Sequence, residues 1–197
     1  MKKTDNKVIV LAILLLLFAG KASPAASSGD SFTTFNDNGG WCWFQDERAL
    51  VHNDMLLFGS VANAAGTDGD NRGGNVEVTT FDLGSRTRIA TTVLHRRLEN
   101  DDHDAPALLR LPDGRILAVY CRHGRDKLIR YRVSRRPDDT TAWQPERQIA
   151  REARVTYSNL FLLPAENGGK GRVYNFYRGE HWNPNWVYSD DLCDTWQ

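Results

Sequence analysis

Residues 106–133 read PALLRLPDGRILAVYCRHGRDKLIRYRV, and this stretch decides the fold class. Two apolar runs, 107–111 and 115–120, flank a Pro-Asp-Gly sequence that favours a tight turn, so a β-hairpin is predicted. The run 128–133 alternates strictly, which places its aliphatic and tyrosine side chains on one face and its arginines on the other. No helical period is sustained beyond Trp41, so we expect an all-β chain.

The same unit recurs along the chain, which indicates a repeat architecture. Matching residues lie 53 to 55 positions apart in three pairs: Pro106 and Asn159, Ser134 and Ser189, and Trp143 and Trp196. A weaker copy starts at Leu50 and is interrupted by a glycine-rich insertion at 62–74. Short strands at this period are typical of β-propeller blades, and about three blades fit between residues 41 and 197. Closed propellers have about four to eight blades, so we expect the propeller to continue beyond the C-terminus.

The N-terminal residues have the organisation of a secretory signal peptide. Three lysines accompany an unbroken apolar run at 8–19, and small residues at 23 and 25 predict cleavage after Ala25. The run is short for a membrane span, and an uncleaved anchor is the alternative. We therefore expect a signal peptide at 1–25, a polar linker at 26–40 and a secreted or periplasmic protein that is not attached to a membrane after cleavage.

Composition excludes several classes of protein. The chain carries 25 Lys plus Arg and 25 Asp plus Glu, and this zero net charge does not suit a dedicated nucleic-acid-binding protein. Its three cysteines are too few for a disulfide framework and none forms a CxxC pair, so we expect buried thiols with at most one disulfide. No cofactor is expected, and a structural metal would need a ligand set that the sequence does not define.

Two histidines occupy corresponding ends of the predicted hairpin. His103 precedes its first strand and His123 follows its second, and these two ends meet at one edge of an antiparallel sheet. By the repeat, Tyr157 and Arg178 occupy similar places in the next blade. We therefore predict that one rim of the propeller gathers these four side chains.

This combination of side chains suits elimination at a uronate. Removing the proton α to a carboxylate requires a cation or donor for the carboxylate, a base of near-neutral pKa and an acid for the departing oxygen. Arginine, histidine and tyrosine can meet those requirements. The sequence shows no separated pair of carboxylates that would indicate a glycosidase, and no Ser-His-Asp or phosphate-loop pattern.

Several motifs resemble the BNR-repeat-containing family, which includes the seven-bladed ulvan lyases and related uronate-specific polysaccharide lyases: Asp101–Ala107, Leu111–Arg115, Tyr120–Gly124, Tyr157–Asn159 and Tyr177–Gly179. The resemblance implies a seven-bladed propeller when complete, acting as a monomer. It also implies β-elimination at a 4-linked uronic acid in an acidic polysaccharide. Residues 189–196 resemble the Asp-box turn of sialidase-like propellers, with Cys193 where glycine is usual.

The resemblance implies roles for individual residues. His103 or Tyr157 would be the base or the acid, and His123 and Arg178 would bind or neutralise the carboxylate. Further contacts to the polysaccharide are expected from neighbouring residues: Arg122, Arg125, Asp104 and Asn159. Of these, Asp104 departs from the family pattern, in which asparagine is expected.

Two other functions fit the same residues. A noncatalytic glycan-binding propeller would hold sugar at this rim without cleaving it, and a sialidase-like hydrolase would need an arginine triad and a nucleophilic tyrosine with a carboxylate partner. Trp182 and Trp186 are expected in the blade core, with stacking on sugar rings as the alternative. The arginines within 130–136 are expected on a solvated face paired with Asp138 and Asp139.

Overall fold

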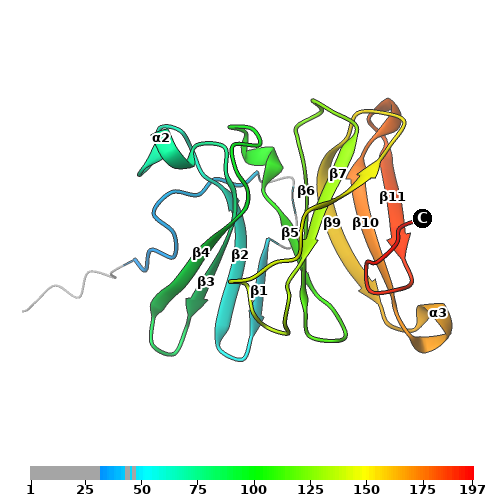
Figure 1. Cartoon of the computed structure of the whole chain (residues 1–197), viewed down its shortest axis with the longest axis horizontal. Helices are drawn as coiled ribbons and strands as arrows, with labels where there is room; N and C mark the ends of the chain where they lie inside the picture. Colours follow the sequence, from blue (N-terminus) through cyan, green and yellow to red (C-terminus); the bar gives the residue numbers. More distant parts are fainter. Residues whose placement is uncertain (1–31, 43–44, 46–47) are drawn as a thin grey trace, which may run out of the picture. The chain divides into compact units, whose positions relative to one another are not determined.

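Short alternating stretches separated by turns form antiparallel sheets in the computed structural model, which describes residues 32–42, 45 and 48–197 (Figure 1). The predicted signal peptide at 1–25 and residues 26–31 of the predicted linker lie outside this described part. Residues Thr34–Gln197 form one compact unit. Within the described ranges, no helix combines the length and the apolar character needed to cross a membrane.

Three sheets, called here blades 1 to 3, are built from strands that pair with their neighbours in the chain. Blade 1 contains β1 (Ala49–His52), β2 (Met55–Val61), β3 (Val76–Asp82) and β4 (Thr87–His95). Blade 2 contains β5 (Ala107–Arg110), β6 (Ile116–Cys121), β7 (Leu128–Val133) and β8 (Arg147–Ala150). Blade 3 contains β9 (Thr156–Leu163), β10 (Arg172–Arg178) and β11 (Pro184–Ser189). Short helical turns lie in the connections: α2 (Gly69–Arg72), η1 (Asp102–Asp104), α3 (Glu166–Gly169) and η2 (Glu180–Trp182).

The structure confirms the predicted hairpin and the repeat. β5 pairs with β6, and Gly114 adopts a φ of 83° in the connecting turn, a conformation that strains residues with a Cβ. β7 covers residues 128–133, as the alternation predicts. The two repeat copies also end alike: the N–H groups of Gln144 and Gln197, each following a repeat tryptophan, donate to the carbonyls of Val133 and Tyr188 over 2.9 and 2.8 Å.

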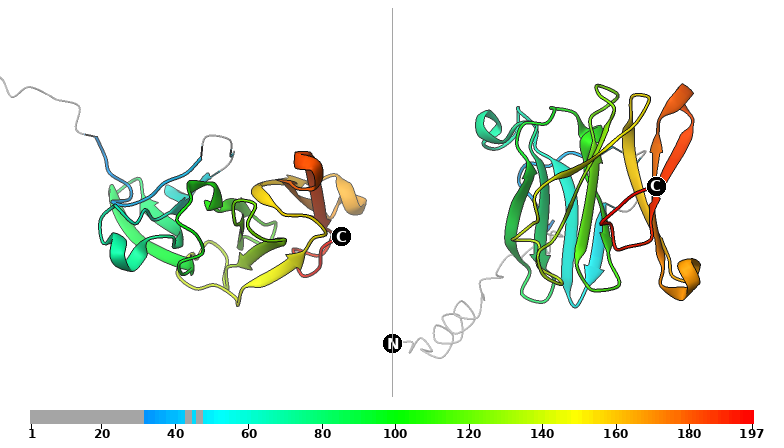
Figure 2. Two further views of the ribbon diagram at one scale, coloured as in Figure 1. Left: turned by 90° about the horizontal axis from the view of Figure 1, so that it is seen from above. Right: turned by 45° about the vertical axis from the view of Figure 1, so that its right-hand side comes forward.

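Strand β6 is buried on both faces because blades pack against both of its sides. Leu117 and Val119 belong to the apolar cluster shared with blade 3, whereas Ile116 and Tyr120 belong to the cluster shared with blade 1. This burial explains why β6 reads as a continuous apolar run instead of alternating. The first strands of successive blades are in contact, β1 with β5 and β5 with β9, and the sheets stand side by side (Figure 2). The chain is therefore an all-β array of three propeller blades.

Two sequence-based expectations need correction, and two are confirmed. Arg130 is only 6% exposed and its guanidinium lies 2.6 Å from the Asp126 carboxylate, which corrects the expectation for this arginine. The exposed Arg136 does pair with Asp139 at 2.9 Å, as expected. The end of the predicted linker packs against blade 1, since the buried Asn38 amide donates to the carbonyls of Asn63 and Thr67. The three cysteines are buried free thiols, as predicted.

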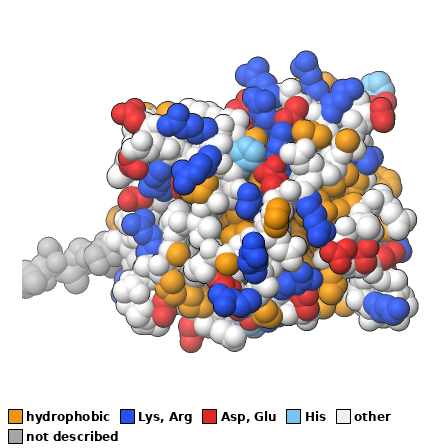
Figure 3. Space-filling model, in the orientation of Figure 1, with side chains coloured by type: hydrophobic (Ala, Val, Ile, Leu, Met, Phe, Trp, Pro, Cys, Tyr) orange, Lys and Arg blue, Asp and Glu red, His pale blue; other side chains and the backbone are white. Residues whose placement is uncertain are grey.

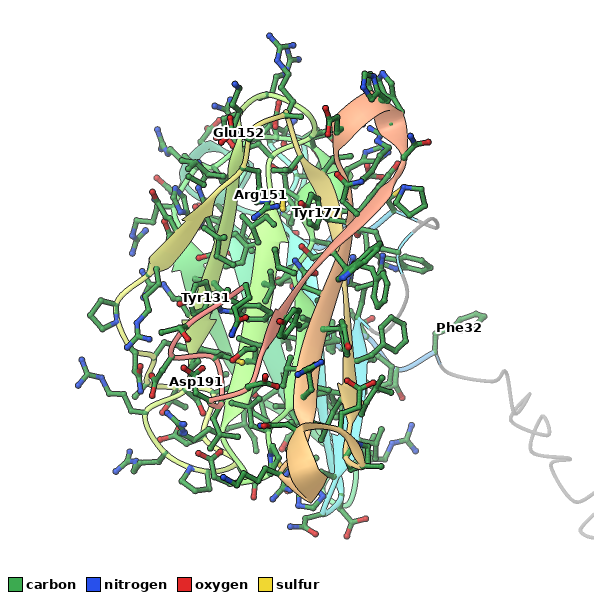
Figure 4. All side chains as sticks on the ribbon, turned by 90° about the vertical axis from the view of Figure 1, so that its right-hand side faces the viewer. Phe32, Tyr131, Arg151, Glu152, Tyr177 and Asp191 are labelled. Carbon is green, nitrogen blue, oxygen red and sulfur yellow. The ribbon has the colours of Figure 1, made fainter. Side chains whose placement is uncertain are left out.

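The turn at 189–196 is held by side-chain hydrogen bonds. Ser189 Oγ donates to Asp191 Oδ1 over 2.8 Å and accepts from the Cys193 N–H over 2.9 Å, while Asp191 accepts from the Thr195 N–H and hydroxyl. Cys193 has a φ of 71°, in the left-handed region where glycine is favoured. The turn lies near Tyr131, whose ring contacts the Trp196 ring edge-on at 5.7 Å (Figure 4). This turn therefore packs against blade 2.

Candidate functional site

The connections that join β4 to β5, β6 to β7, β8 to β9 and β10 to β11 lie at one end of the sheets, together with the β2–β3 connection that holds α2. These five connections form the upper edge of the view (Figure 1), and we call this end the rim. Basic side chains gather along this edge, over the β6–β7 and β8–β9 connections (Figure 3). The rim therefore combines loops from successive blades with a local excess of positive charge, although the whole chain is neutral.

The structure brings His103 and His123 together, as the hairpin argument predicts. Their rings are stacked, with centroids 3.9 Å apart and planes 8° apart. Asp101 bridges them: its Oδ1 accepts from Nδ1 of His103 over 2.6 Å and its Oδ2 accepts from Nδ1 of His123 over 3.0 Å. One carboxylate therefore fixes the orientation of both imidazoles.

The bridging carboxylate also determines which ring nitrogen is available. Burial opposes ionisation of Asp101, but hydrogen bonds from the His103 N–H and from both imidazoles hold its pKa below the usual range. Because each Nδ1 donates to this carboxylate, Nε2 is the proton-accepting nitrogen of each neutral ring. Asp102 adds a second carboxylate on the same side, since its Oδ1 lies 2.9 Å from His103 Nδ1.

Tyr157 reaches this pair from blade 3 because the start of β9 is irregular. The β9–β10 register shifts between Phe176 and Arg178, and Tyr157 has a φ of 63°. Its ring centroid lies 5.5 Å from that of His103 and 6.3 Å from that of His123. The Arg178 guanidinium lies 4.9 Å from the same ring. Burial raises the pKa of Tyr157, and the Arg178 cation offsets only part of this rise.

The two predicted substrate-binding arginines are paired with a carboxylate within the protein. Arg125 Nε lies 3.0 Å from Glu99 Oε1, and Arg122 Nε lies 3.6 Å from Glu99 Oε2. Glu99 also accepts a 3.1 Å hydrogen bond from the backbone N–H of His123. Glu99 therefore anchors the β6–β7 connection, and any anion that binds these arginines must compete with it.

Asp104 and Asn159 occupy places different from the four residues at the centre of the rim. Asp104 is fully buried, which corrects its expected role as a direct contact to sugar. Burial, together with the charges of Glu99 and Asp101, raises the pKa of Asp104 to about 9. Asn159 lies in β9 opposite Phe176 and is partly buried.

Sequence reasoning missed Asp101, Glu99 and Gln45 as members of this site. Gln45 supports the backbone of His103 by donating from its side chain to the His103 carbonyl. The signal for Asp101 was its position two residues before a histidine, where its carboxylate can cap the short turn η1 and also accept from the ring. Nothing in the local sequence indicated that Glu99 would contact the β6–β7 connection.

Two groups of potential metal ligands overlap this site, namely Asp101 with both histidines and Cys42 with Asp102 and His103. In each group the donor atoms lie within 4.8 Å of one another, a spacing that could hold a metal ion. In the first group the hydrogen bonds from the two imidazoles to Asp101 already account for this spacing. The geometry of this first donor set therefore needs no ion to explain it.

Two tryptophans expected in the blade core are at the surface, which corrects that expectation. Trp182 is 72% exposed and Trp186 is 57% exposed. His95 and His52 lie away from the pair at the rim, with His95 Nδ1 2.6 Å from Glu146 and His52 Nε2 3.8 Å from Asp138. These two histidines therefore have structural partners of their own.

Comparison with known proteins identifies similar folds and a family. Two solved structures of ulvan lyases, described as a new polysaccharide lyase family, PL25, have a similar fold. They match with TM-scores of 0.62 and 0.60 at 16% identity, and the first was determined with -[GlcA(1-4)Rha3S]- bound. Each match covers 84% of this chain but 40% of the lyase, so the chain spans less than half the length of those proteins. No curated protein sequence matches significantly. Because residues 65–191 match the family described as BNR repeat-containing, the chain belongs to that family.

Proposed function

We propose that the rim is the active site of a secreted polysaccharide lyase that cleaves an acidic, uronate-containing polysaccharide by β-elimination. The observation that carries the proposal is the convergence of two stacked imidazoles, a phenol and a guanidinium from two blades. The fold likeness to lyases supports it, and one of those lyases was studied with a glucuronate-containing fragment bound.

The reaction requires two proton transfers and one cation. A base removes the proton from C5 of the uronate, the electron pair forms the C4=C5 double bond, and the C4–O bond breaks. An acid then donates a proton to the departing oxygen. A cation near the carboxylate stabilises the negative charge that develops when the C5 proton leaves.

The environments of the side chains favour one assignment of these roles. The raised pKa of Tyr157 keeps its hydroxyl protonated near neutral pH, so Tyr157 is the proton donor to the departing oxygen. Nε2 of His103 is the base, because Asp101 holds its Nδ1 as a donor. His123 and Arg178 bind the carboxylate, and Asp101 is a positioning residue.

The test is to add uronate polysaccharides to the full chain and to follow the ultraviolet absorbance of the conjugated double bond. Ulvan is the first substrate to test, followed by alginate and hyaluronan. His103→Ala and Tyr157→Phe should abolish the rise in absorbance while leaving the affinity for polysaccharide within a few fold. The matched controls are His52→Ala and Tyr174→Phe, since Tyr174 donates to Glu166 away from the rim and both variants should keep the wild-type rate.

The alternatives give different results. A folded wild-type chain that binds polysaccharide without producing the double bond would refute the lyase function and support a glycan-binding propeller. Release of reducing sugar without formation of the double bond would refute the lyase function and support a hydrolase.

A further inference from the structure

A second feature adjoins the four proposed active-site residues. A cleft of about 260 Å³ is lined by Arg178 and by residues that include Arg154, His181 and Trp182. Trp182 belongs to η2, in the β10–β11 connection, and is 72% exposed despite its large apolar ring. An apolar ring of this size in water at the mouth of a cleft is an available contact surface for a ligand.

The backbone holds Trp182 outward in an uncommon conformation. His181 and Trp182 have φ values of 53° and 64°, in the left-handed region that disfavours residues with bulky side chains. The turn is closed by the Gly179 N–H, which donates to the Asn183 carbonyl over 3.1 Å, and by Asn185 Oδ1, which accepts from the Glu180 N–H over 3.0 Å. The exposed position of this ring is thus set by specific hydrogen bonds.

Trp182 is connected to the proposed catalytic residues through Arg178. The Arg178 guanidinium lies 4.3 Å from the centroid of the Trp182 ring and 4.9 Å from that of the Tyr157 ring, so it contacts both rings. Its buried Nε has no hydrogen-bond partner within the described part of the chain. A sugar ring lying on Trp182 would therefore be adjacent to a uronate held at Arg178.

Arg154 supplies the charge of this cleft. It is exposed, and among residues 32–42, 45 and 48–197 it forms no hydrogen bond or ion pair, unlike Arg122 and Arg125, which share Glu99. A guanidinium without a protein carboxylate is well suited to bind a carboxylate or a sulfate ester. An aromatic platform beside such a cation matches a sugar with an apolar C–H face and an acidic substituent.

We propose that Trp182 and Arg154 form a subsite for the sugar next to the uronate that is cleaved, and that this sugar carries a carboxylate or a sulfate ester. The proposal rests on the proposed function for the identity of the neighbouring uronate. Binding at Trp182, however, can be measured without turnover. The proposed subsite and the proposed lyase function can therefore fail separately.

The experiment compares two exposed tryptophans four residues apart. Trp182→Gly removes the platform and also relieves the left-handed backbone, so loss of binding cannot be attributed to a strained turn. Trp186→Ala is the matched control, because Trp186 packs on blade 3 against Phe176 at 6.3 Å and does not line the cleft. Affinities of the full chain for ulvan, desulfated ulvan, alginate and hyaluronan would be measured by titration calorimetry.

Trp182→Gly should weaken binding about tenfold, and Trp186→Ala should leave it within about twofold. Arg154→Gln should weaken binding and reduce the dependence of binding on salt. It should weaken the binding of ulvan and of desulfated ulvan by the same factor only if the group bound by Arg154 is a carboxylate. Equal effects of the two tryptophan variants, or no binding of the wild-type chain to any of the four polysaccharides, would overturn the proposal. A tenfold loss in Trp182→Gly without double-bond formation by the wild type would support the subsite and refute the lyase function.

Discussion

Replacing Asp104 by asparagine should stabilise the protein, and the gain should depend on pH. Asp104 is fully buried, and neither of its carboxyl oxygens has a hydrogen-bond partner within the described residues. Burial and the nearby charges of Glu99 and Asp101 raise its pKa from 3.8 to about 9. The folded protein therefore keeps this carboxyl protonated at neutral pH, whereas the unfolded chain ionises it. Asparagine has nearly the same shape and avoids this difference because it does not titrate.

The size and sign of the effect follow from linkage. A raised folded-state pKa means that the contribution of Asp104 to stability is greatest below its unfolded pKa of 3.8 and is lost as the pH rises toward about 9. Each pH unit in this interval costs about 1.4 kcal/mol, so the free energy lost at pH 7 is about 4 kcal/mol. Asp104→Asn should recover much of this amount at pH 7 and almost none near pH 4.

Urea unfolding of the wild type and the variant at pH 5, 6, 7 and 8 would test this reasoning. The difference in unfolding free energy should increase by about 1.4 kcal/mol per pH unit. Asp70→Asn, an exposed substitution in α2, is the control and should show no such slope. A difference for Asp104→Asn that stays constant with pH would show that this carboxyl is ionised in the folded protein, which would refute the reasoning.

Three further predictions follow from the packing and from the hydrogen bonds of the site. Asp101→Asn removes the charge that orients both imidazoles. It should lower the turnover rate at least about tenfold and leave the affinity for polysaccharide within a few fold of the wild type. A turnover rate equal to that of the wild type would contradict the positioning role. Leu160→Ala should destabilise the fold by about 2–5 kcal/mol because Leu160 is fully buried between blades 2 and 3, whereas Leu163→Ala, at a side chain 43% exposed, should cost much less in urea unfolding. The three thiols should react with a disulfide reagent only after unfolding, since all are buried and burial raises the pKa of Cys121 and Cys193 to about 12; rapid labelling of the native protein would disagree.

The features that could be predicted from sequence are those set by local pattern. The turn at Pro112–Gly114 and the alternation of 128–133 fix a hairpin and a third strand. The geometry of an antiparallel hairpin then brings the residues before its first strand close to those after its second. This was sufficient to predict that His103 and His123 are neighbours, because the argument uses only strand direction and chain order.

The features that could not be predicted depend on side-chain direction and on contacts between blades. Asp104 follows His103 directly, yet the short turn η1 directs one side chain to the rim and the other into the protein, and the sequence does not encode that direction in any simple period. Trp182 was expected in the core because large aromatic residues usually are buried, but a two-residue left-handed turn places it in solvent. The ion pairs of Glu99 with Arg122 and Arg125 join the β4–β5 connection to the β6–β7 connection, and only the folded arrangement shows them.

The site depends on how blade 3 packs against blade 2, because neither blade holds a complete set of groups. Blade 2 supplies the two imidazoles and the loop that carries Asp101, while Tyr157, Arg178 and Trp182 all come from blade 3. Leu160 and Val173 from blade 3 pack with Leu117 and Val119 from blade 2, and this apolar cluster fixes the separation of the two blades. Proton transfer tolerates only displacements well below 1 Å. A cavity in this apolar cluster should therefore lower the rate of the proposed elimination before it unfolds the chain. Core packing between the blades thus contributes to the geometry of the proposed active site as well as to stability.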